Sequence, residues 1–295
     1  MMTLSGPELA LENRAFEAIA GLAQREFGLH ITSEKLKMVQ SRLRHRLSAL
    51  QLQNFAAYSD LVCSEQGAAE RRYMISALTT NVSHFFREPH HFELLSDAIL
   101  RGLQQKIAAG ERIRIWSAGC SNGQEPYSIA MHLLREEPSI AQADFKILAT
   151  DIDPKVVAFA QEGLYGEALV KGVSASDKSR FMRAEGDGLR VVDDVRKHIS
   201  FRELNLQAEW PMRHKFDVMF CRNVVIYFDQ NTQERLWPRF HKMLKPGGFL
   251  CLGHSERISA PAQFGFKSIG TTAYKKCDAA VSSASLLPGG QNGTA

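Results

Sequence analysis

The sequence predicts an α/β protein in which an all-helical N-terminal unit precedes a mostly parallel sheet with a small β insertion. Two observations lead to this class. From about residue 8 to residue 80, apolar side chains such as Phe16, Ile19 and Ala23 recur at helical spacing. From about residue 111, short apolar runs alternate with helical segments, which is the pattern of parallel strands joined by right-handed crossovers.

In the N-terminal unit, the helix expected at residues 32–50 combines a leucine stripe with basic edges, and Thr32 or Ser33 is its expected cap. The stripe is Leu36, Val39, Leu43, Leu47 and Leu50. At about 100° per residue, basic side chains fall on both flanks of this stripe. Lys35, Arg42 and Arg46 lie on one flank, and Lys37 and Arg44 lie on the other. A solvated helix surface and a patch that meets an acidic partner both fit this pattern.

The second unit contains six apolar runs that we predict as strands. They are residues 112–118, 145–150, 199–204, 216–221, 248–253 and 266–275. Helices are expected at residues 124–136, 154–162 and 232–244. The long polar segment 163–198 contains a turn signal followed by a strand signal, which predicts the β insertion.

These patterns divide the chain into three parts. Residues 1–80 are the helical domain, and residues 81–277 are the sheet domain with a linker at 81–92 and a β-subdomain at about 163–200. Residues 278–295 are expected to be disordered.

Composition excludes several classes of protein. The five cysteines are scattered and form no C-x-x-C pair, which argues for reduced thiols in a cytosol and against a zinc site or a disulfide framework. The chain has no run of about 18 apolar residues and no apolar N-terminal segment typical of a signal peptide. We therefore expect a cytoplasmic protein without membrane insertion.

The stretch "WSAGCSNGQEPYS" at residues 116–128 predicts a ligand-binding loop after the first strand. Gly119 and Gly123 would let the backbone approach a ligand closely. Asp151 follows the second strand, where an acid commonly accepts hydrogen bonds from ribose hydroxyls. Asp153 stands before Pro154 and is interpreted as the N-cap of the next helix.

Loop and acid together indicate a cofactor that contains adenosine, and leave NAD, FAD and S-adenosylmethionine open. Three features favour S-adenosylmethionine. The loop lacks the third glycine of a dinucleotide fingerprint, and Glu125 would repel a pyrophosphate. The stretch "LKPGGFLCLG" at residues 244–253 also looks like the lead-in to the fifth strand of class I methyltransferases.

Five sequence segments, in the same order along the chain, resemble the motifs of one known family. They are "LTTNVSHFFREPHHF" (78–92), "SAGCSNGQEPYSIAM" (117–131), "ATDID" (149–153), "LNL" (204–206) and "FCRNVVIYFD" (220–229). From about residue 10 to residue 277 the chain resembles the chemotaxis receptor glutamate methyltransferases, the CheR family. The resemblance implies a Rossmann-like class I S-adenosylmethionine-dependent methyltransferase domain behind an all-α domain. It also implies methyl transfer to glutamate side chains of chemoreceptor cytoplasmic domains for sensory adaptation, with S-adenosylhomocysteine as product.

The resemblance also implies a set of cofactor contacts, to which Gly119 of the loop is added. They are Asn81, Ser83, Arg87, Glu125, Asp151, Asn205, Leu206, Arg222 and Asn223. Arg87 suits the methionine carboxylate, Glu125 suits the ammonium or a ribose hydroxyl, and Asp151 suits the ribose. Groups at Asn205 and Leu206 could contact the adenine.

Glutamate is ionised at neutral pH, so its methylation needs no general base. Catalysis is then expected from alignment and desolvation of the carboxylate. Arg87 and Tyr227 are the expected catalytic residues, although Tyr227 could instead be an aromatic at the edge of the core. His84, His90 and His91 lack ligand spacing, so no metal is expected.

The expected partner is the helical bundle of a chemoreceptor. Lys35, Arg42, Arg44 and Arg46 are the residues expected to contact its acidic helices. In relatives the β-subdomain grips a receptor C-terminal tether peptide, but the turn at residues 183–191 looks shorter here, which favours a tether-independent enzyme. No nucleic-acid partner is expected, because the chain lacks an N-P-P-Y or D-P-P-Y run. Two alternatives stay open: a methyltransferase that acts on another protein or a small acid, and a non-catalytic regulator that binds the cofactor.

Overall fold

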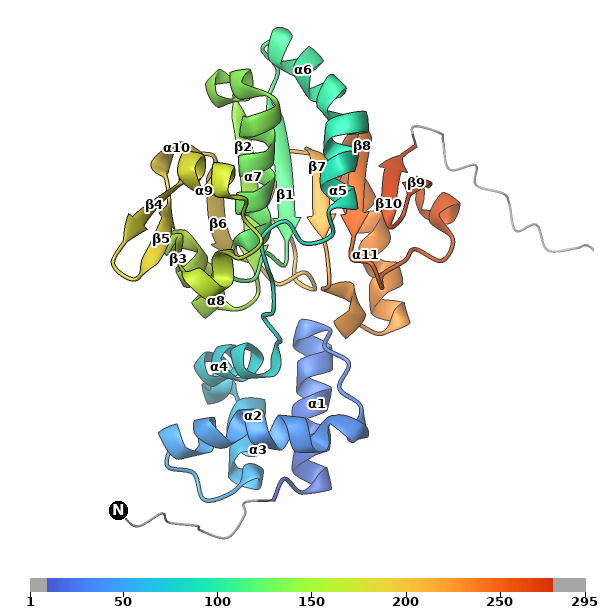
Figure 1. Cartoon of the computed structure of the whole chain (residues 1–295). Helices are drawn as coiled ribbons and strands as arrows, with labels where there is room; N and C mark the ends of the chain where they lie inside the picture. Colours follow the sequence, from blue (N-terminus) through green and yellow to red (C-terminus); the bar gives the residue numbers. More distant parts are fainter. Residues whose placement is uncertain (1–9, 278–295) are drawn as a thin grey trace, which may run out of the picture.

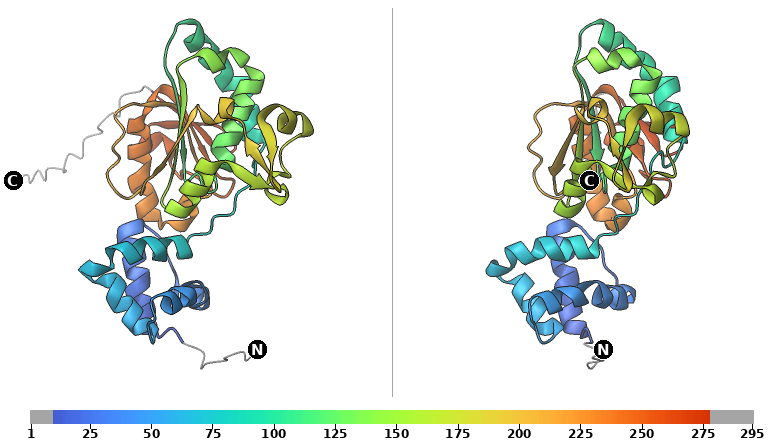
Figure 2. Two further views of the ribbon diagram at one scale, coloured as in Figure 1. Left: turned by 90° about the vertical axis from the view of Figure 1, so that its left-hand side faces the viewer. Right: turned by 60° about the vertical axis from the view of Figure 1, so that its left-hand side comes forward.

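The computed structural model describes residues 10–277, which form a helical lobe and a sheet lobe connected by residues 79–89 (Figure 1). The predicted disordered tail at 278–295 lies outside the described residues. The arrowheads of β1 and β7 point toward the helical lobe, so the carboxyl ends of the central strands face it (Figure 1). Figure 2 shows in two further views that the helical lobe lies beneath this edge of the sheet.

The N-terminal lobe is helical, as predicted, and its described residues form four α-helices. They are α1 (Asn13–Phe27), α2 (Leu36–Ala49), α3 (Phe55–Cys63) and α4 (Ala68–Leu78). The leucine stripe of α2 is confirmed, because Val39, Leu43 and Leu47 are all buried in the core. The predicted cap is wrong: a 3₁₀ turn at Ser33–Lys35 precedes α2, and the side chain of Thr32 makes no capping hydrogen bond.

The main sheet has seven strands in the order β6-β2-β1-β7-β8-β10-β9. Its strands are β1 (Ile113–Ala118), β2 (Phe145–Asp151), β6 (Ile199–Glu203), β7 (Phe216–Cys221), β8 (Leu244–Leu252), β9 (Phe266–Gly270) and β10 (Ala273–Lys276). The strands from β6 to β8 pair in parallel, and β10 pairs antiparallel with both of its neighbours. The run predicted as one strand at 266–275 is therefore wrong in detail, because it folds into a hairpin that turns at Thr272, whose φ is positive.

Helices cover both faces of this sheet. They are α5 (His90–Leu94), α6 (Leu100–Ala108), α7 (Gln124–Glu136), α8 (Pro154–Glu162) and α11 (Gln230–Met243). Figure 2 shows α11 on one face and α6 with α7 on the other. This is the predicted α/β arrangement, and it brings the loops after β1, β2 and β7 to one edge.

The predicted β insertion is confirmed. It is a three-stranded antiparallel sheet in the order β3-β5-β4 that projects from the side of the main sheet (Figure 1). Its elements are β3 (Leu164–Gly166), α9 (Ala175–Phe181), β4 (Met182–Glu185), β5 (Gly188–Val191) and α10 (Asp193–Arg196). Gly186 and Asp187 alone connect β4 to β5, so the hairpin turn is short.

The C-terminal end of α1 joins the two lobes. Gly28 ends this helix with φ +75°, a left-handed conformation that favours glycine. The next two residues pair with the loop after β7: Leu29 forms a β-bridge with Phe228, and the His30 amide donates to the Tyr227 carbonyl at 2.8 Å. The helical lobe is thus hydrogen-bonded to the segment that carries Tyr227.

Two of the basic residues on α2 stabilise their own lobe. Arg46 donates through Nε and Nη2 to the two oxygens of Glu70 at 2.8 and 2.6 Å, and it stacks on the ring of Tyr73. Arg42 donates to the Leu78 carbonyl at 2.6 Å and so closes the end of α4. Among the described residues, no helix combines the length and the apolar character needed to cross a membrane.

The pair between Arg46 and Glu70 predicts a stability effect. Arg46→Ala would leave the Glu70 carboxylate, which is 7% exposed, without its bidentate partner. We expect the free energy of unfolding to fall by about 2–3 kcal/mol, measured by urea denaturation. Lys35→Ala, at an exposed position before α2, is the control and should change it by less than about 0.5 kcal/mol. Equal effects of the two substitutions would show that the pair adds no stability.

Candidate active site

A cavity of about 870 Å³, a volume that includes the space open to solvent at its mouth, lies at the carboxyl edge of the sheet between the two lobes. Ten of the residues singled out in the sequence line it. They are Asn81, Ser83, Arg87, Gly119, Glu125, Asp151, Leu206, Arg222, Asn223 and Tyr227. The fold thus brings into one cavity residues that are up to 146 positions apart in the sequence, from Asn81 to Tyr227.

Close packing against neighbouring residues requires glycine at two positions of the loop after β1. Gly119 has φ +84°, and a Cβ there would lie 2.2 Å from Cγ2 of Val224. Gly123 has φ +85° and forms the N-cap of α7, where a Cβ would lie 2.7 Å from the Ala160 Cβ. Both positions therefore need glycine, and the first lets the loop after β7 lie directly against the cavity floor.

Glu125 presents a buried carboxylate in the first turn of α7. It accepts a hydrogen bond from Ser117 Oγ at 2.6 Å and lies 3.3 Å from Nη1 of Arg222. Burial raises the pKa of Glu125, and Arg222 opposes this rise. A cationic ligand group beside this carboxylate would be stabilised by its charge.

Asp151 ends β2 and is held by backbone amides. Its oxygens accept from Ser121 N at 2.8 Å and from Asp153 N at 3.0 Å. Burial raises its pKa to about 6. Asp153 caps α8 through a bond from Lys155 N, as predicted, and Asn81 Nδ2 donates to the other oxygen of Asp153 at 2.8 Å. Asn81 is therefore fixed in the cavity wall by a side chain of the sheet lobe.

Arg87 lies in a conformationally strained part of the segment that connects the lobes. Phe86 and Glu88, on either side of it, have φ values of 54° and 59°. The Phe86 amide donates to Ser128 Oγ at 2.9 Å, and Arg87 Nη1 donates to the Val82 carbonyl at 3.2 Å. These bonds hold the guanidinium of Arg87 at the cavity wall.

Arg222 connects both walls of the cavity. Its side chain is 2% exposed, and it lies 3.3 Å from Glu125 through Nη1 and 3.3 Å from Glu88 through Nε. Its Nη2 also donates to the carbonyl of Arg87. Arg222 was predicted as a cofactor contact, and the structure shows in addition that it orders Glu125 and the backbone of Arg87.

Glu88 is a site residue that the sequence analysis missed. It stands two residues before α5, and its carboxylate binds Arg222 and accepts from the His254 amide at 3.1 Å. Burial of Glu88 favours the neutral acid, but Arg222 and His254 outweigh it, so its pKa is lowered. A glutamate with positive φ leaves no signal in the sequence that would reveal this role.

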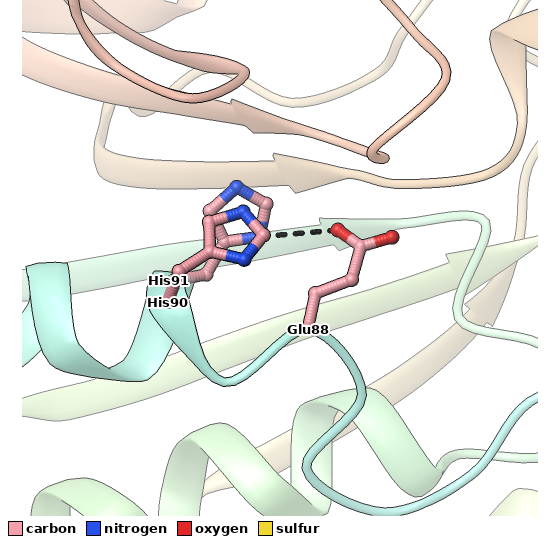
Figure 3. A group of neighbouring side chains, drawn as sticks. All are labelled: Glu88, His90 and His91. Atoms are coloured by element: carbon pink, nitrogen blue, oxygen red, sulfur yellow. Dashed lines mark ion pairs between the residues drawn. The ribbon is translucent and has the colours of Figure 1, made fainter.

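Glu88, His90 and His91 form the group shown in Figure 3, and their possible metal-ligand atoms lie within 4.8 Å of one another. His91 Nδ1 lies 3.4 Å from a Glu88 oxygen. Burial, followed by Arg222, lowers the pKa of His91 to about 3, so the ring is neutral. Both oxygens of Glu88 already have partners, and the positive charge of Arg222 at the same carboxylate disfavours a cation there.

Tyr227 lines the cavity, as expected for a catalytic residue, whereas the side chain of Asn205 points elsewhere. Tyr227 belongs to the 3₁₀ turn Val225–Tyr227 and lines the cavity, beside Phe228 and close to Arg222 in the chain. Asn205 does not line it: Nδ2 donates to the Glu26 carbonyl at 2.7 Å and Oδ1 accepts from the Gln207 amide. Asn205 therefore fastens α1 to the sheet lobe, and its neighbour Leu206 contributes to the cavity.

Apolar side chains that the sequence analysis did not single out complete the cavity wall. They are Leu29, Val82, Ile152, Leu204, Val224 and Phe228. Leu29 comes from the helical lobe, far from the loop segments in sequence, and the β-bridge to Phe228 together with the adjacent His30–Tyr227 bond brings it here. Such a wall suits the flat apolar face of a base.

Comparisons with known proteins cover both lobes. Residues 14–79 match the all-alpha domain of CheR methyltransferase, and residues 81–275 match its SAM-binding domain. A protein of Rhizobium etli described as "Probable chemotaxis protein methyltransferase" is 50% identical over 252 residues, covering 84% of this chain and 94% of the relative. The "Chemotaxis protein methyltransferase" of Escherichia coli is 41% identical over 256 residues, covering 85% of this chain and 87% of the relative.

The family matches follow the two lobes, and the cavity between them contains the acids, the glycine loop and the apolar wall that S-adenosylmethionine requires. The resemblance noted in the sequence is therefore confirmed by relatives that match most of the chain and by the two family matches. The chain belongs to the CheR methyltransferase family and is an S-adenosylmethionine-dependent methyltransferase.

Proposed function

We propose that this enzyme transfers the methyl group of S-adenosylmethionine to glutamate side chains of chemoreceptor cytoplasmic domains, forming glutamate methyl esters for sensory adaptation. The observation that carries the proposal is the placement of Arg87 and Tyr227 in the wall of the cavity that also contains Glu125 and Asp151. The names of the relatives, which are chemotaxis protein methyltransferases, support the choice of substrate.

The cofactor supplies an electrophilic methyl group on a sulfonium sulfur. In the proposed assignment, Glu125 binds the ammonium group or a ribose hydroxyl, Asp151 accepts from the ribose, and Arg87 pairs with the methionine carboxylate. Asn81, Ser83, Gly119, Leu206 and Asn223 complete the contacts, and Arg222 acts mainly by ordering Glu125. Asn205 would contribute through its backbone or by positioning Leu206, because its side-chain amide is bonded elsewhere.

The chemistry is an in-line displacement. The bond from sulfur to the methyl carbon breaks while a bond from that carbon to a carboxylate oxygen of the substrate forms, and no proton has to be removed. The chain contributes alignment and desolvation. Tyr227 can donate its hydroxyl to the substrate carboxylate. Arg87, which pairs with the methionine carboxylate in this assignment, adds positive charge to the cavity wall and so favours the ionised form of the substrate glutamate.

The proposal predicts the chemical nature of the product. Labelled S-adenosylmethionine incubated with the enzyme and receptor cytoplasmic fragments should give alkali-labile label on receptor glutamates. Tyr227→Phe is the matched variant, since it removes one hydroxyl from the cavity wall; it should lower the transfer rate about tenfold or more and leave cofactor affinity nearly intact. Label on other acceptors would support a different methyltransferase, and cofactor binding without transfer would support a non-catalytic regulator.

The raised pKa of Asp151 predicts how cofactor binding depends on pH. A carboxylate with a pKa of about 6 takes up a proton as the pH falls through that value, and the neutral acid then accepts more weakly from ribose hydroxyls. The affinity for S-adenosylhomocysteine, measured by calorimetry between pH 5 and 8, should therefore weaken below about pH 6.

Asp151→Asn is the control for this pH dependence. The variant should bind more weakly at pH 8 and should show a flatter profile. The raised pKa of Glu125 acts in the same direction and leaves part of the dependence in place. A profile as steep as that of the wild type would exclude Asp151 as the titrating group.

We propose that the receptor bundle docks on the exposed basic side chains of the helical lobe. Lys35, Lys37 and Arg44 are exposed, whereas Arg42 and Arg46 are half-buried and bonded inside the lobe. Arg42 and Arg46 would thus act by stabilising the helical lobe.

We also propose that the enzyme does not need a receptor tether peptide, which the short β4–β5 hairpin supports. Binding of an aromatic-ended receptor tail peptide to the protein would contradict this. Because the proposed substrates are cytoplasmic domains, we expect the enzyme to act in the cytoplasm.

Charge reversal can test the two exposed flanks of α2 separately. Lys35→Glu alters one flank, and Lys37→Glu with Arg44→Glu alters the other. Reversal on the docking flank should lower receptor methylation about tenfold at low salt and weaken its salt dependence, because steering by charge is screened by ions. Lys267→Glu, exposed on β9, is the control and should leave methylation unchanged. Unchanged methylation in both flank variants would remove α2 from the docking surface.

A further inference from the structure

The turn after β7 carries Asn223, Val224 and Tyr227 into the cavity, and its backbone needs an unusual support. Asn223 has a positive φ of 59°, which costs free energy for a residue with a side chain. Val224 packs over Gly119 at the cavity floor. A turn of this shape persists only where the surrounding structure holds it in place.

That support comes from Glu256, a buried residue in the loop after β8 that is 3% exposed. One carboxylate oxygen accepts from the amides of Gly253 at 2.6 Å and Asn223 at 2.8 Å. The other accepts from the amides of Val224 at 2.8 Å and Ile226 at 3.2 Å. A single side chain thus satisfies four backbone N–H groups, three of which belong to the turn.

Strand pairing explains why Glu256 can reach the turn. β7 and β8 run in parallel with Cys221 opposite Leu252, so the loops that follow them leave the sheet side by side. The loops approach so closely that a Cβ on Gly253 would lie 2.7 Å from the Asn223 nitrogen. On its other side the turn is bonded to the helical lobe, where the His30 amide donates to the Tyr227 carbonyl.

We propose that Glu256 is a positioning residue for methyl transfer, which fixes the Asn223–Ile226 backbone and thereby the place of Tyr227 in the cavity. Glu256 does not line the cavity, so it acts through the turn and touches neither reactant. The role of Tyr227 rests on the proposed function, whereas the hold of Glu256 on the turn does not.

The first test is hydrogen exchange of the full chain, which needs no methyl acceptor. Glu256→Gln keeps the size of the side chain but places an NH₂ group against two backbone N–H donors. We expect the amides of Asn223, Val224 and Ile226 to exchange at least about tenfold faster, while the amides of β1 keep their protection. Unchanged exchange at these three amides would overturn the proposal.

The second test is a double-mutant cycle on the rate of receptor methylation. Glu256→Gln should lower kcat by about 10- to 100-fold, because a displaced turn misaligns Tyr227. In the Tyr227→Phe background the same change should cost less than about threefold. The full factor in both backgrounds would show that Glu256 does not act through Tyr227.

Two further variants separate positioning from general destabilisation. Asp217→Asn alters a buried carboxylate at the opposite end of β7, where Asp217 binds Lys106, Lys245 and the Arg114 amide. It should lower the melting temperature and leave kcat within about twofold below that temperature. Glu256→Asp retains the charge with a shorter reach and should give a kcat between those of the wild type and Glu256→Gln. If the wild type methylated no receptor glutamate while exchange rose as expected, the proposed substrate would be wrong and the hold of Glu256 on the turn would stand.

Discussion

The buried guanidinium of Arg222 is the interaction on which the active site depends. It lies between two carboxylates, Glu88 and Glu125, and also donates to the carbonyl of Arg87. Two acids this well buried would otherwise favour their neutral forms. Arg222 opposes this shift at Glu125, where the cofactor is proposed to bind, and it also binds the backbone carbonyl of Arg87.

The helical lobe is also part of the catalytic architecture. The end of α1 is bonded to the sheet lobe through Leu29, His30 and the Glu26 carbonyl. Leu29 enters the cavity wall, and His30 binds the carbonyl of Tyr227. A partner docked on the helical lobe would therefore contact the same lobe that contributes Leu29 to the cavity wall and binds the Tyr227 carbonyl.

The helix α2 has an apolar stripe that could be predicted from the sequence and basic flanks whose contacts could not. The apolar stripe of α2 could be predicted because period and burial are linked by helix geometry. Which basic side chains stay exposed could not be predicted, because this depends on the groups that α4 places beside α2. Glu70 and the end of α4 bind Arg46 and Arg42, and leave Lys35 and Lys37 exposed.

The fold class, most strands and helices, the glycine loop and Asp151 could all be predicted from local patterns, because these features rest on residue spacing and on the common edge of parallel strands. Glu88 and Glu256, and the place of Asn205 at the junction between the lobes, became visible in three dimensions alone. Each of these side chains acts through a partner that is far away in sequence, such as the backbone of Asn223 for Glu256 or Arg222 for Glu88. Local patterns specify which side chains leave an element, whereas the three-dimensional fold decides which groups they meet.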